Sequence, residues 1–453
     1  MGNISTEKIS VERITNGPRH HLFGFHDLLI SNRTGEKYLS LEADIINRPP
    51  LPGEKFGVGY VESNQYVRVG ETTALNYPQG ARQQWVGDSN YFTVNNRVGS
   101  AWGSDLYDAD TNRLIRSYEA TAHMITRDGK YALGLDYARL HRLGGYGYTG
   151  IADVNSTDPF PTNAGITIMD MQTGNAKLLV SVRQVAECGT STRSSASHHY
   201  LTHLCLNPAS NRVAFLHRYF MPDGGLMTRL MTIGINGDNL RCIAHGFLSH
   251  FDWKDNQHIY IYGRSGSPVD AMRNSSFMQN PIVKHSFRFV RKCIKTMVGR
   301  NKAVVGGMSF LMITDSDQPV IVPFAKDIIP TDGHPMTNPV NDNICICDTY
   351  PDKDGFRDLF LYKFNEDTRI NIENFRMIFD KPDMQLKAQF LSGIDCKILK
   401  SVSEDLIGFT RSGLHCDLHP RWSSDGKYAV FDSIHEGTRQ IYRISMADFI
   451  ANT

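Results

Sequence analysis

The sequence predicts an all-β protein, a seven-bladed β-propeller with an inserted basic helix, and three observations support this fold class. A pattern of histidine, short strand, polar turn and apolar strand recurs, most clearly over residues 419–432, where Asp425-Gly426 forms the turn. Glycine is frequent, with 38 residues, and aromatic residues make up 10%, as expected for many short strands and turns. The chain also has 17 histidines, and several stand at the start of a repeat.

Seven segments carry this pattern along the chain. The first two cover residues 23–43 and 83–119, with histidine or glutamine at His26 and Gln84. The other five begin at His123, His203, His250, His334 and His419. Four strands in roughly 45–60 residues match one propeller blade. The sequence therefore predicts a single propeller domain over residues 1–453.

Insertions at 44–80, 139–164 and 265–305 interrupt the repeats, and loops of this length are usually functional. Within 265–305, an apolar helical stripe runs from Val283 to Met297, with lysines and arginines largely on the other faces. This amphipathic helix has two interpretations. It packs on the propeller with a solvated basic edge, or residues 281–302 contact a membrane surface or a polyanion.

Net charge, apolar runs and cysteine spacing limit the partners and the cellular compartment that the sequence predicts. The net charge of +1 does not indicate a nucleic-acid partner. Residues 1–16 lack a secretory apolar run, and no stretch reaches the ~18 apolar residues of a membrane span. We therefore expect a cytoplasmic protein, with peripheral contact at the inner membrane face as a further option. The eight cysteines lack metal-finger spacing, and only Cys416 lies between histidines.

The first residues of the innermost strands should meet at one mouth of the channel. Of these, His250 and His334, together with His415-Cys416-Asp417-Leu418-His419, could supply three or four nitrogen and sulfur ligands. Such a set suits Zn²⁺ or another borderline transition metal. The alternative is a hydrogen-bonded polar plug that closes the channel.

A second group of polar residues lies on the third and fourth segments. If the strands form an antiparallel meander, Arg218 shares one rim with His203. An arginine that neutralises a carboxylate, beside histidine and tyrosine as acid and base, suits β-elimination on a uronic-acid sugar. We expect four residues to contact the substrate: Arg82, Gln84, His199 and His203.

Competing signatures are weak. The sequence has no G-x-S-x-G motif and no P-loop. A carboxylate pair for glycoside hydrolysis stays open, because four aspartates lie near expected strand ends: Asp27, Asp136, Asp252 and Asp332. Aspartate at such positions is more often a turn or cap residue.

The chain resembles the propeller-type polysaccharide lyases, namely the oligogalacturonate lyases and the ulvan lyases. Residues 419–426, the histidine-rich start of the fourth segment and His217-Arg218 carry this resemblance, and the His123 and His141 pair is similar to the two-histidine arrangement of the ulvan lyases. The final repeat is also similar to TolB-type propellers, which only bind partners. The spacing over residues 415–419 and the basic insertion depart from the lyase pattern.

The resemblance implies a role for each matching position. Arg218 would neutralise the carboxylate, and the acid–base candidates would be His123, His141 and Tyr200. A divalent transition metal, zinc or manganese, would be held by His250, His334, Cys416 and His419.

The sequence thus predicts a lyase that cleaves a uronate-containing oligo- or polysaccharide by β-elimination. The alternatives are a non-catalytic propeller that acts as a scaffold or binds glycans in a surface-polysaccharide pathway, and a glycoside hydrolase. A metal site favours the enzyme over the scaffold. An unsaturated product distinguishes the lyase from the hydrolase.

Overall fold

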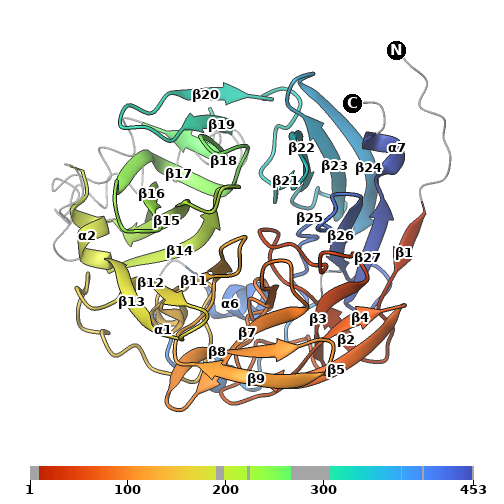
Figure 1. Cartoon of the computed structure of the whole chain (residues 1–453), viewed down its shortest axis with the longest axis horizontal. Helices are drawn as coiled ribbons and strands as arrows, with labels where there is room; N and C mark the ends of the chain where they lie inside the picture. Colours follow the sequence, from red (N-terminus) through yellow and green to blue (C-terminus); the bar gives the residue numbers. More distant parts are fainter. Residues whose placement is uncertain are drawn as a thin grey trace.

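The strands of this protein form antiparallel sheets that follow one another around a ring in sequence order (Figure 1). The computed structural model describes residues 10–189, 198–221, 225–266, 307–378, 380–399 and 402–450. The all-β propeller class that the sequence predicts is confirmed. The predicted amphipathic helix at 281–302 lies outside the described residues.

The first three sheets each contain four strands, joined in chain order. Sheet one consists of β2 (His20–Leu22), β3 (Lys37–Ala43), β4 (Phe56–Glu62) and β5 (Gln65–Thr72). Sheet two consists of β6 (Gln84–Trp85), β7 (Tyr91–Val98), β8 (Ala101–Asp108) and β9 (Arg113–Tyr118). Sheet three consists of β10 (Met124–Ile125), β11 (Tyr131–Gly134), β12 (Gly165–Asp170) and β13 (Ala176–Ser181). The predicted insertion at 44–80 is therefore partly wrong, because β4 and β5 belong to the first sheet.

The fourth sheet has seven strands because one long strand serves two neighbours. It consists of β14 (His199–Leu206), β15 (Arg212–Phe220), β16 (Leu226–Gly234), β17 (Arg241–Trp253), β18 (His258–Ser265), β19 (Ser309–Thr314) and β20 (Ile321–Phe324). The first half of β17 pairs with β16 and the second half with β18. Counting this sheet as two blades depends on that division, so the number of blades stays a prediction.

The last two sheets bring the chain ends together. The fifth sheet consists of β21 (Met336–Asn338), β22 (Asn341–Asp348), β23 (Phe356–Lys363) and β24 (Thr368–Arg376). The sixth consists of β25 (Arg421–Trp422), β26 (Tyr428–Ser433), β27 (Gln440–Ser445) and β1 (Val11–Arg13). Val11 pairs with Ile444, so the first strand lies beside the last strand and closes the ring (Figure 1).

Polar side chains link each of several sheets to the next. The carboxylate of Asp432 on β26 accepts the backbone N–H of Phe23, and the amide oxygen of Asn95 on β7 accepts that of Ala122. Asp348 on β22 accepts the N–H of His419 at 3.2 Å. These bonds satisfy backbone donors that would otherwise be buried without partners.

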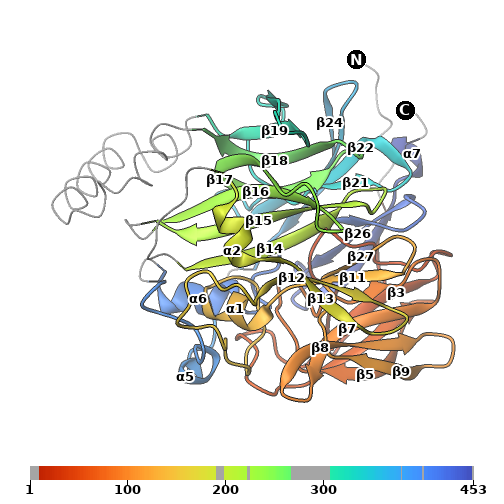
Figure 2. The same cartoon turned by 60° about the vertical axis from the view of Figure 1, so that its left-hand side comes forward.

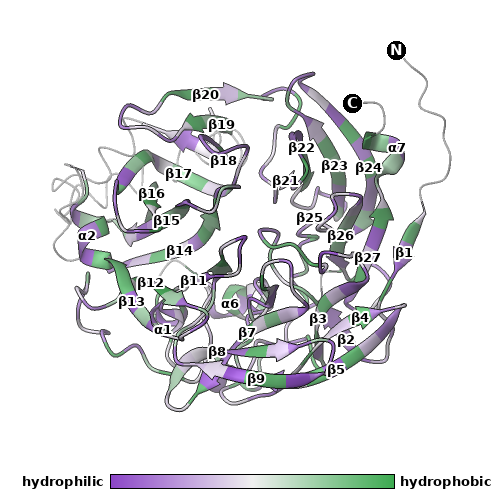
Figure 3. Ribbon diagram, in the orientation of Figure 1, coloured by the Kyte–Doolittle hydropathy of each residue, from purple (hydrophilic) through white to green (hydrophobic). Residues whose placement is uncertain are grey.

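The hydrophobic core lies within and between the sheets, and the outermost strands face solvent. Most residues of β9 and β24 are exposed or half-buried, and hydrophilic stretches on both are visible in Figure 3. By contrast, Ile344, Leu359 and Trp422 are buried between the last two sheets. Inner strands such as β14 and β16 are buried at consecutive positions because neighbouring sheets cover both of their faces.

Short helices accompany the sheets. Five lie within the described residues: α1 (Tyr137–Arg142), α2 (Val182–Glu187), α5 (Lys387–Phe390), α6 (Glu404–Thr410) and α7 (Ala447–Ile450). Helices α1, α5 and α6 gather at the same side of the molecule (Figure 2). The link is direct, because the His141 ring on α1 bonds the carbonyl of Ser392 and contacts Arg411. Over the described residues, none of the helices has the length and apolar character that crossing a membrane requires.

Candidate metal and substrate site

Histidines from the fourth sheet and from the segments that lead into the fifth and sixth sheets meet on the ring axis, around Phe25. The His334 ring centroid lies 4.2 Å from that of His250 and 4.3 Å from that of His419. The Phe25 centroid lies 4.9 Å from His419 and 5.1 Å from His203. The predicted convergence is therefore seen for these four histidines, whereas the ring of His123, the fifth predicted member, stacks on Tyr137.

Local backbone geometry directs two of these histidines inward. His203 has a φ of 56° and lies in a β-bulge between Thr202 and Cys205, and His419 has a φ of 43°. Bulges and left-handed residues interrupt the alternation of a strand and reorient a side chain. Such strained positions are common at functional sites.

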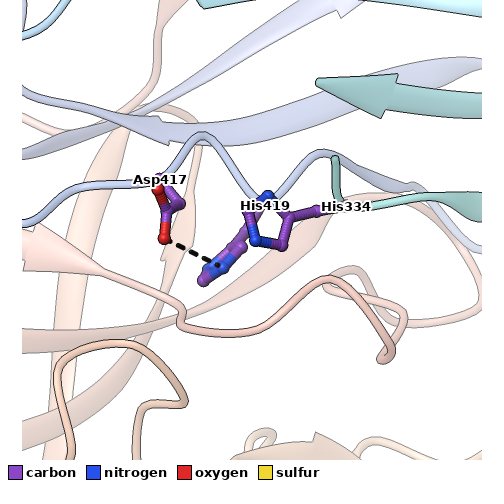
Figure 4. Close-up of side chains that lie close together, drawn as sticks. All are labelled: His334, Asp417 and His419. Carbon is purple, nitrogen blue, oxygen red and sulfur yellow. Dashed lines mark ion pairs between the residues drawn. The ribbon is translucent and has the colours of Figure 1, made fainter. Parts of the chain in front are cut away.

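Three buried side chains form a candidate metal-ligand group: His334, Asp417 and His419 (Figure 4). One ligand atom from each lies within 4.8 Å of the others, and His419 Nε2 is 3.7 Å from an Asp417 carboxylate oxygen. Two ligands of one transition metal lie roughly 3.4 Å apart for bonds of 2.0–2.2 Å. Small side-chain shifts would therefore bring the three to coordination distance.

In both histidines of this group, Nδ1 forms a hydrogen bond to a neighbouring acceptor. His334 Nδ1 donates to the Asp348 carboxylate at 2.7 Å, and His419 Nδ1 donates to the Gly24 carbonyl at 2.8 Å. This fixes the tautomer of each ring in its neutral form, in which the Nε2 lone pair is available to a metal. Carboxylate or carbonyl partners of this kind typically orient histidines that bind metals.

The charge balance of the group also suits a cation. Burial opposes the ionised form of Asp417, yet the Arg357 guanidinium 2.5 Å away and the nearby histidines hold its pKa well below the usual range. Burial lowers the pKa of His419 well below its usual value, so this ring is neutral at pH 7. Burial opposes protonation of His334 as well, but Asp348 raises its pKa.

The other two residues of the predicted metal set lie outside this group. His250 Nδ1 bonds Asp332 at 3.1 Å, and its ring lies against His334. The side chain of Cys416 packs in a hydrophobic cluster, and burial raises its thiol pKa to about 11. His415 and His419 both lie beside Asp417, whereas Cys416 and Leu418 pack in hydrophobic clusters, so Asp417 stands where a thiolate was expected.

A small cavity lies beside the histidine cluster. Its volume is about 10 Å³, which is enough for roughly one water molecule. It is lined by Phe25, His26, Asp27, His203, Cys205, His250 and Phe251. Neither ring nitrogen of His26 has a hydrogen-bond partner among the described residues. A bound water would satisfy this ring, which agrees with the expected polar plug on the axis.

Arginine and tyrosine residues adjoin the histidines. Tyr200 and Arg218 are direct partners across β14 and β15. The Tyr146 centroid lies 5.5 Å from that of His203. Tyr350, which is 39% exposed, has its centroid 5.4 Å from that of His334. The group therefore combines a cation, phenols and imidazoles at one place.

Two of the expected substrate-contacting residues join neighbouring sheets. Arg82 forms a bidentate ion pair with Asp27, with distances of 2.7 and 3.0 Å, and also donates to the His123 carbonyl. Gln84 accepts the N–H of Ile125 at 2.8 Å. Both side chains are buried, and these bonds account for a structural role. Their contact with substrate stays a prediction.

The histidines that were expected to act as acid or base also form hydrogen bonds within the protein. His123 Nδ1 bonds the Tyr137 hydroxyl at 2.7 Å. His141 lies in α1 rather than in a loop, its Nε2 donates to the Ser392 carbonyl, and burial lowers its pKa to about 4. His199 Nδ1 bonds His217 Nε2 at 2.9 Å, and burial lowers the His199 pKa to about 3. Their functional roles stay predictions.

The four strand-end aspartates are likewise held by neighbours. Asp27 pairs with Arg82, and Asp136 caps α1. Asp252 accepts the N–H of Thr337, and Asp332 bonds His250. Only Asp136 has the cap role that is usual for aspartate, but the other three are held by an arginine, a backbone N–H and a histidine, so these bonds do not favour a hydrolase pair.

Sequence reasoning missed three residues of the site. Asp417 was visible through the alternation of residues 415–419. Asp348 and Tyr146 carried no such signal, because their proximity to the histidines depends on how separate sheets meet.

Comparisons with known proteins bear on the fold. No family model and no curated protein matches this chain. It is similar to a solved oligogalacturonate lyase in complex with manganese, with 13% identity over 97% of this chain and 94% of that chain, and a TM-score of 0.57. It is also similar to an oligogalacturonate lyase from Vibrio parahaemolyticus, with 12% identity over 98% and 95% and a TM-score of 0.54. At these identities the likeness establishes a shared fold, as the sequence resemblance implied.

Proposed function

We propose that this protein is a metal-dependent lyase that cleaves a uronate-containing oligo- or polysaccharide by β-elimination. The observation that carries the proposal is the pair of histidines with tethered Nδ1 atoms, His334 and His419, with Asp417 beside them on the ring axis. A metal site next to an arginine and two tyrosines supports an enzyme more than a scaffold.

The donor set suits a divalent transition metal. Two imidazole nitrogens and a carboxylate oxygen are ligands for both zinc and manganese. The similar oligogalacturonate lyase is described as a complex with manganese, which supports the same class of ion. When bound, such an ion would supply positive charge to the acidic sugar.

Arg218 has the chemistry to neutralise the sugar carboxylate. No ion pair joins it to a carboxylate in the described part of the chain, and its Nε is buried without a hydrogen-bond partner. A bidentate contact with the sugar carboxylate would stabilise the negative charge that develops when the adjacent carbon loses its proton.

Tyr200 is our acid–base candidate. Burial raises the pKa of its phenol, while the charges of Arg218 and Arg411 lower it. In β-elimination a base removes the proton next to the carboxylate, the bond to the leaving oxygen breaks, and a carbon–carbon double bond forms. Tyr200 would accept or return a proton in this sequence. His123 and His141 are retained as further acid–base candidates.

The test is near-ultraviolet absorbance of the unsaturated sugar during incubation with a panel of uronate polymers and oligomers, with and without manganese or zinc. We expect rising absorbance on at least one substrate, and loss of at least 100-fold in rate for Arg218→Ala. The matched control is Arg33→Ala, an exposed arginine, which should keep full activity. An Arg218→Ala protein with unchanged activity would contradict the assignment.

A metal-filled protein that forms no product across the panel would favour the alternative, a non-catalytic propeller that scaffolds or binds glycans. We further propose that the protein is a single domain that acts in the cytoplasm, with residues 281–302 contacting the inner membrane face. Sedimentation with anionic vesicles, compared between the whole chain and a variant with that segment's lysines and arginines replaced by glutamine, tests this contact. Equal sedimentation would contradict it.

A further inference from the structure

Two arginines near Tyr200 lack a carboxylate partner in the part of the chain that the structure describes: Arg218 and Arg411. Arg411 follows α6 and is only 9% exposed, and Arg218 is half-buried. The Arg411 guanidinium forms two long hydrogen bonds, to His141 Nδ1 at 3.4 Å and to the Gly145 carbonyl at 3.3 Å. Neither acceptor carries a negative charge.

Most of the other buried arginines in the described residues pair with a carboxylate. Five that are less than 2% exposed each pair with an aspartate: Arg82, Arg139, Arg357, Arg421 and Arg439. Arg229 instead donates to two backbone carbonyls and to the Cys242 sulfur. Arg411 has neither a carboxylate nor short bonds to neutral acceptors, so its buried charge is poorly compensated and an anionic ligand would stabilise it.

Both unpaired arginines lie next to the same tyrosines. Arg218 is the strand partner of Tyr200. Arg411 bonds Gly145, and a Cβ atom placed on Gly145 would lie 3.4 Å from the Tyr200 ring. Burial raises the pKa values of Tyr146 and Tyr200, whereas the charges of both arginines lower them. The two guanidinium groups therefore act on one site from two elements that are far apart in sequence.

We infer that Arg411 binds a second acidic group of the glycan, on a sugar next to the one whose carboxylate Arg218 neutralises. This inference rests on the proposed function, which supplies the first carboxylate. The shared chemistry is an oxyanion that accepts two N–H bonds from a guanidinium, either a second uronate carboxylate or a sulfate ester. Arg411 would thus select glycans with acidic groups on neighbouring sugars.

Calorimetric binding with the metal-loaded protein tests the inference. The probes are a uronate trisaccharide with free carboxylates, the same trisaccharide with neighbouring carboxylates methyl-esterified, and a trisaccharide with a sulfate on the neighbouring sugar. We expect wild type to bind at least one doubly acidic probe about 10- to 100-fold more tightly than the ester, since a charged hydrogen bond is lost. The doubly acidic probe that binds more tightly identifies the second group as carboxylate or sulfate.

Substitutions then assign the effect to Arg411. Arg411→Gln should remove the preference for the doubly acidic probe and leave binding of the ester unchanged, and Arg411→Lys should restore part of it. Arg33→Gln, which removes an exposed charge, should behave as wild type. Equal preference in wild type and Arg411→Gln would overturn the inference. The ester comparison on wild type needs no variant, so a poorly folded Arg411→Gln protein does not remove the test.

The two proposals can fail separately. Selective binding of a doubly acidic probe without unsaturated product would refute the lyase and leave the second anion site standing. Unsaturated product with equal binding of all probes would support the lyase and refute the role of Arg411. Absence of binding to every probe would overturn the Arg411 inference.

Discussion

Replacing Asp348 with asparagine should weaken metal binding although Asp348 is outside the ligand group. Its carboxylate accepts His334 N–H at 2.8 Å and His334 Nδ1 at 2.7 Å through one oxygen, and His419 N–H at 3.2 Å through the other. The asparagine oxygen can still serve His334. Its NH₂ group would face the His419 N–H donor, so one buried donor loses its acceptor.

The size of the effect follows from these three bonds. Removing a charged partner that orients a metal-binding histidine usually lowers metal affinity by about 10- to 100-fold. That range equals about 1.4–2.7 kcal/mol of binding free energy. Asp348→Asn should weaken metal binding more than a substitution at the protein surface does, because Asp348 is only 1% exposed.

Calorimetric titration of metal-free protein with manganese and with zinc measures this change. Asp342→Asn is the matched control, since Asp342 lies on the same strand, β22, and is exposed. We expect Asp342→Asn to bind metal as wild type does. Affinity of Asp348→Asn within threefold of wild type would refute the claim that this carboxylate orients the ligands.

Two further outcomes are expected. Asp432→Asn leaves Arg421 and Arg439 buried without their counter-ion and should lower the free energy of unfolding by about 3–5 kcal/mol, or Tm by about 3–5 °C. Urea unfolding checks this, and a loss below about 1 kcal/mol would contradict it. Burial lowers the pKa values of His21 and His141 to about 4, so the unfolded chain takes up their protons first as pH falls below about 6.5. Each should contribute about 2 kcal/mol of stability at pH 7 that is lost by pH 5. A free energy of unfolding that is equal at pH 7 and pH 5 would contradict this.

Local signals predicted the repeats but not every strand. The turn at Asp425-Gly426 forms as expected, with a φ of 70° at the glycine, and Asp128-Gly129 forms a similar turn with a φ of 72°. The sequence predicts an insertion over 44–80, but β4 and β5 lie within it, and neither strand contains a histidine. The shared strand β17 and the pairing of β1 with β27 depend on contacts that leave no local pattern in the sequence.

For the candidate site, the sequence predicted which histidines lie close together, but it did not predict every ligand. Equivalent positions in the repeats brought His203, His250, His334 and His419 to the axis. The choice of the remaining ligand depended on the direction of one side chain. Asp417 was distinguishable from Cys416 by alternation, whereas the tether from Asp348 arises from a neighbouring sheet and was not.

Ring closure by β1 has a consequence for biosynthesis. Glu12 on the first strand bonds Arg443 on the last at 2.6 Å, and 431 residues separate them in the chain. At about 5–20 residues per second, the ribosome delivers the second partner roughly 20–90 seconds after the first. During that time β1 has no partner strand, although the sheets made from residues between β1 and β27 can already form. A nascent chain stalled before residue 440 would therefore expose this strand to proteases and chaperones, and release of the finished chain would end that exposure.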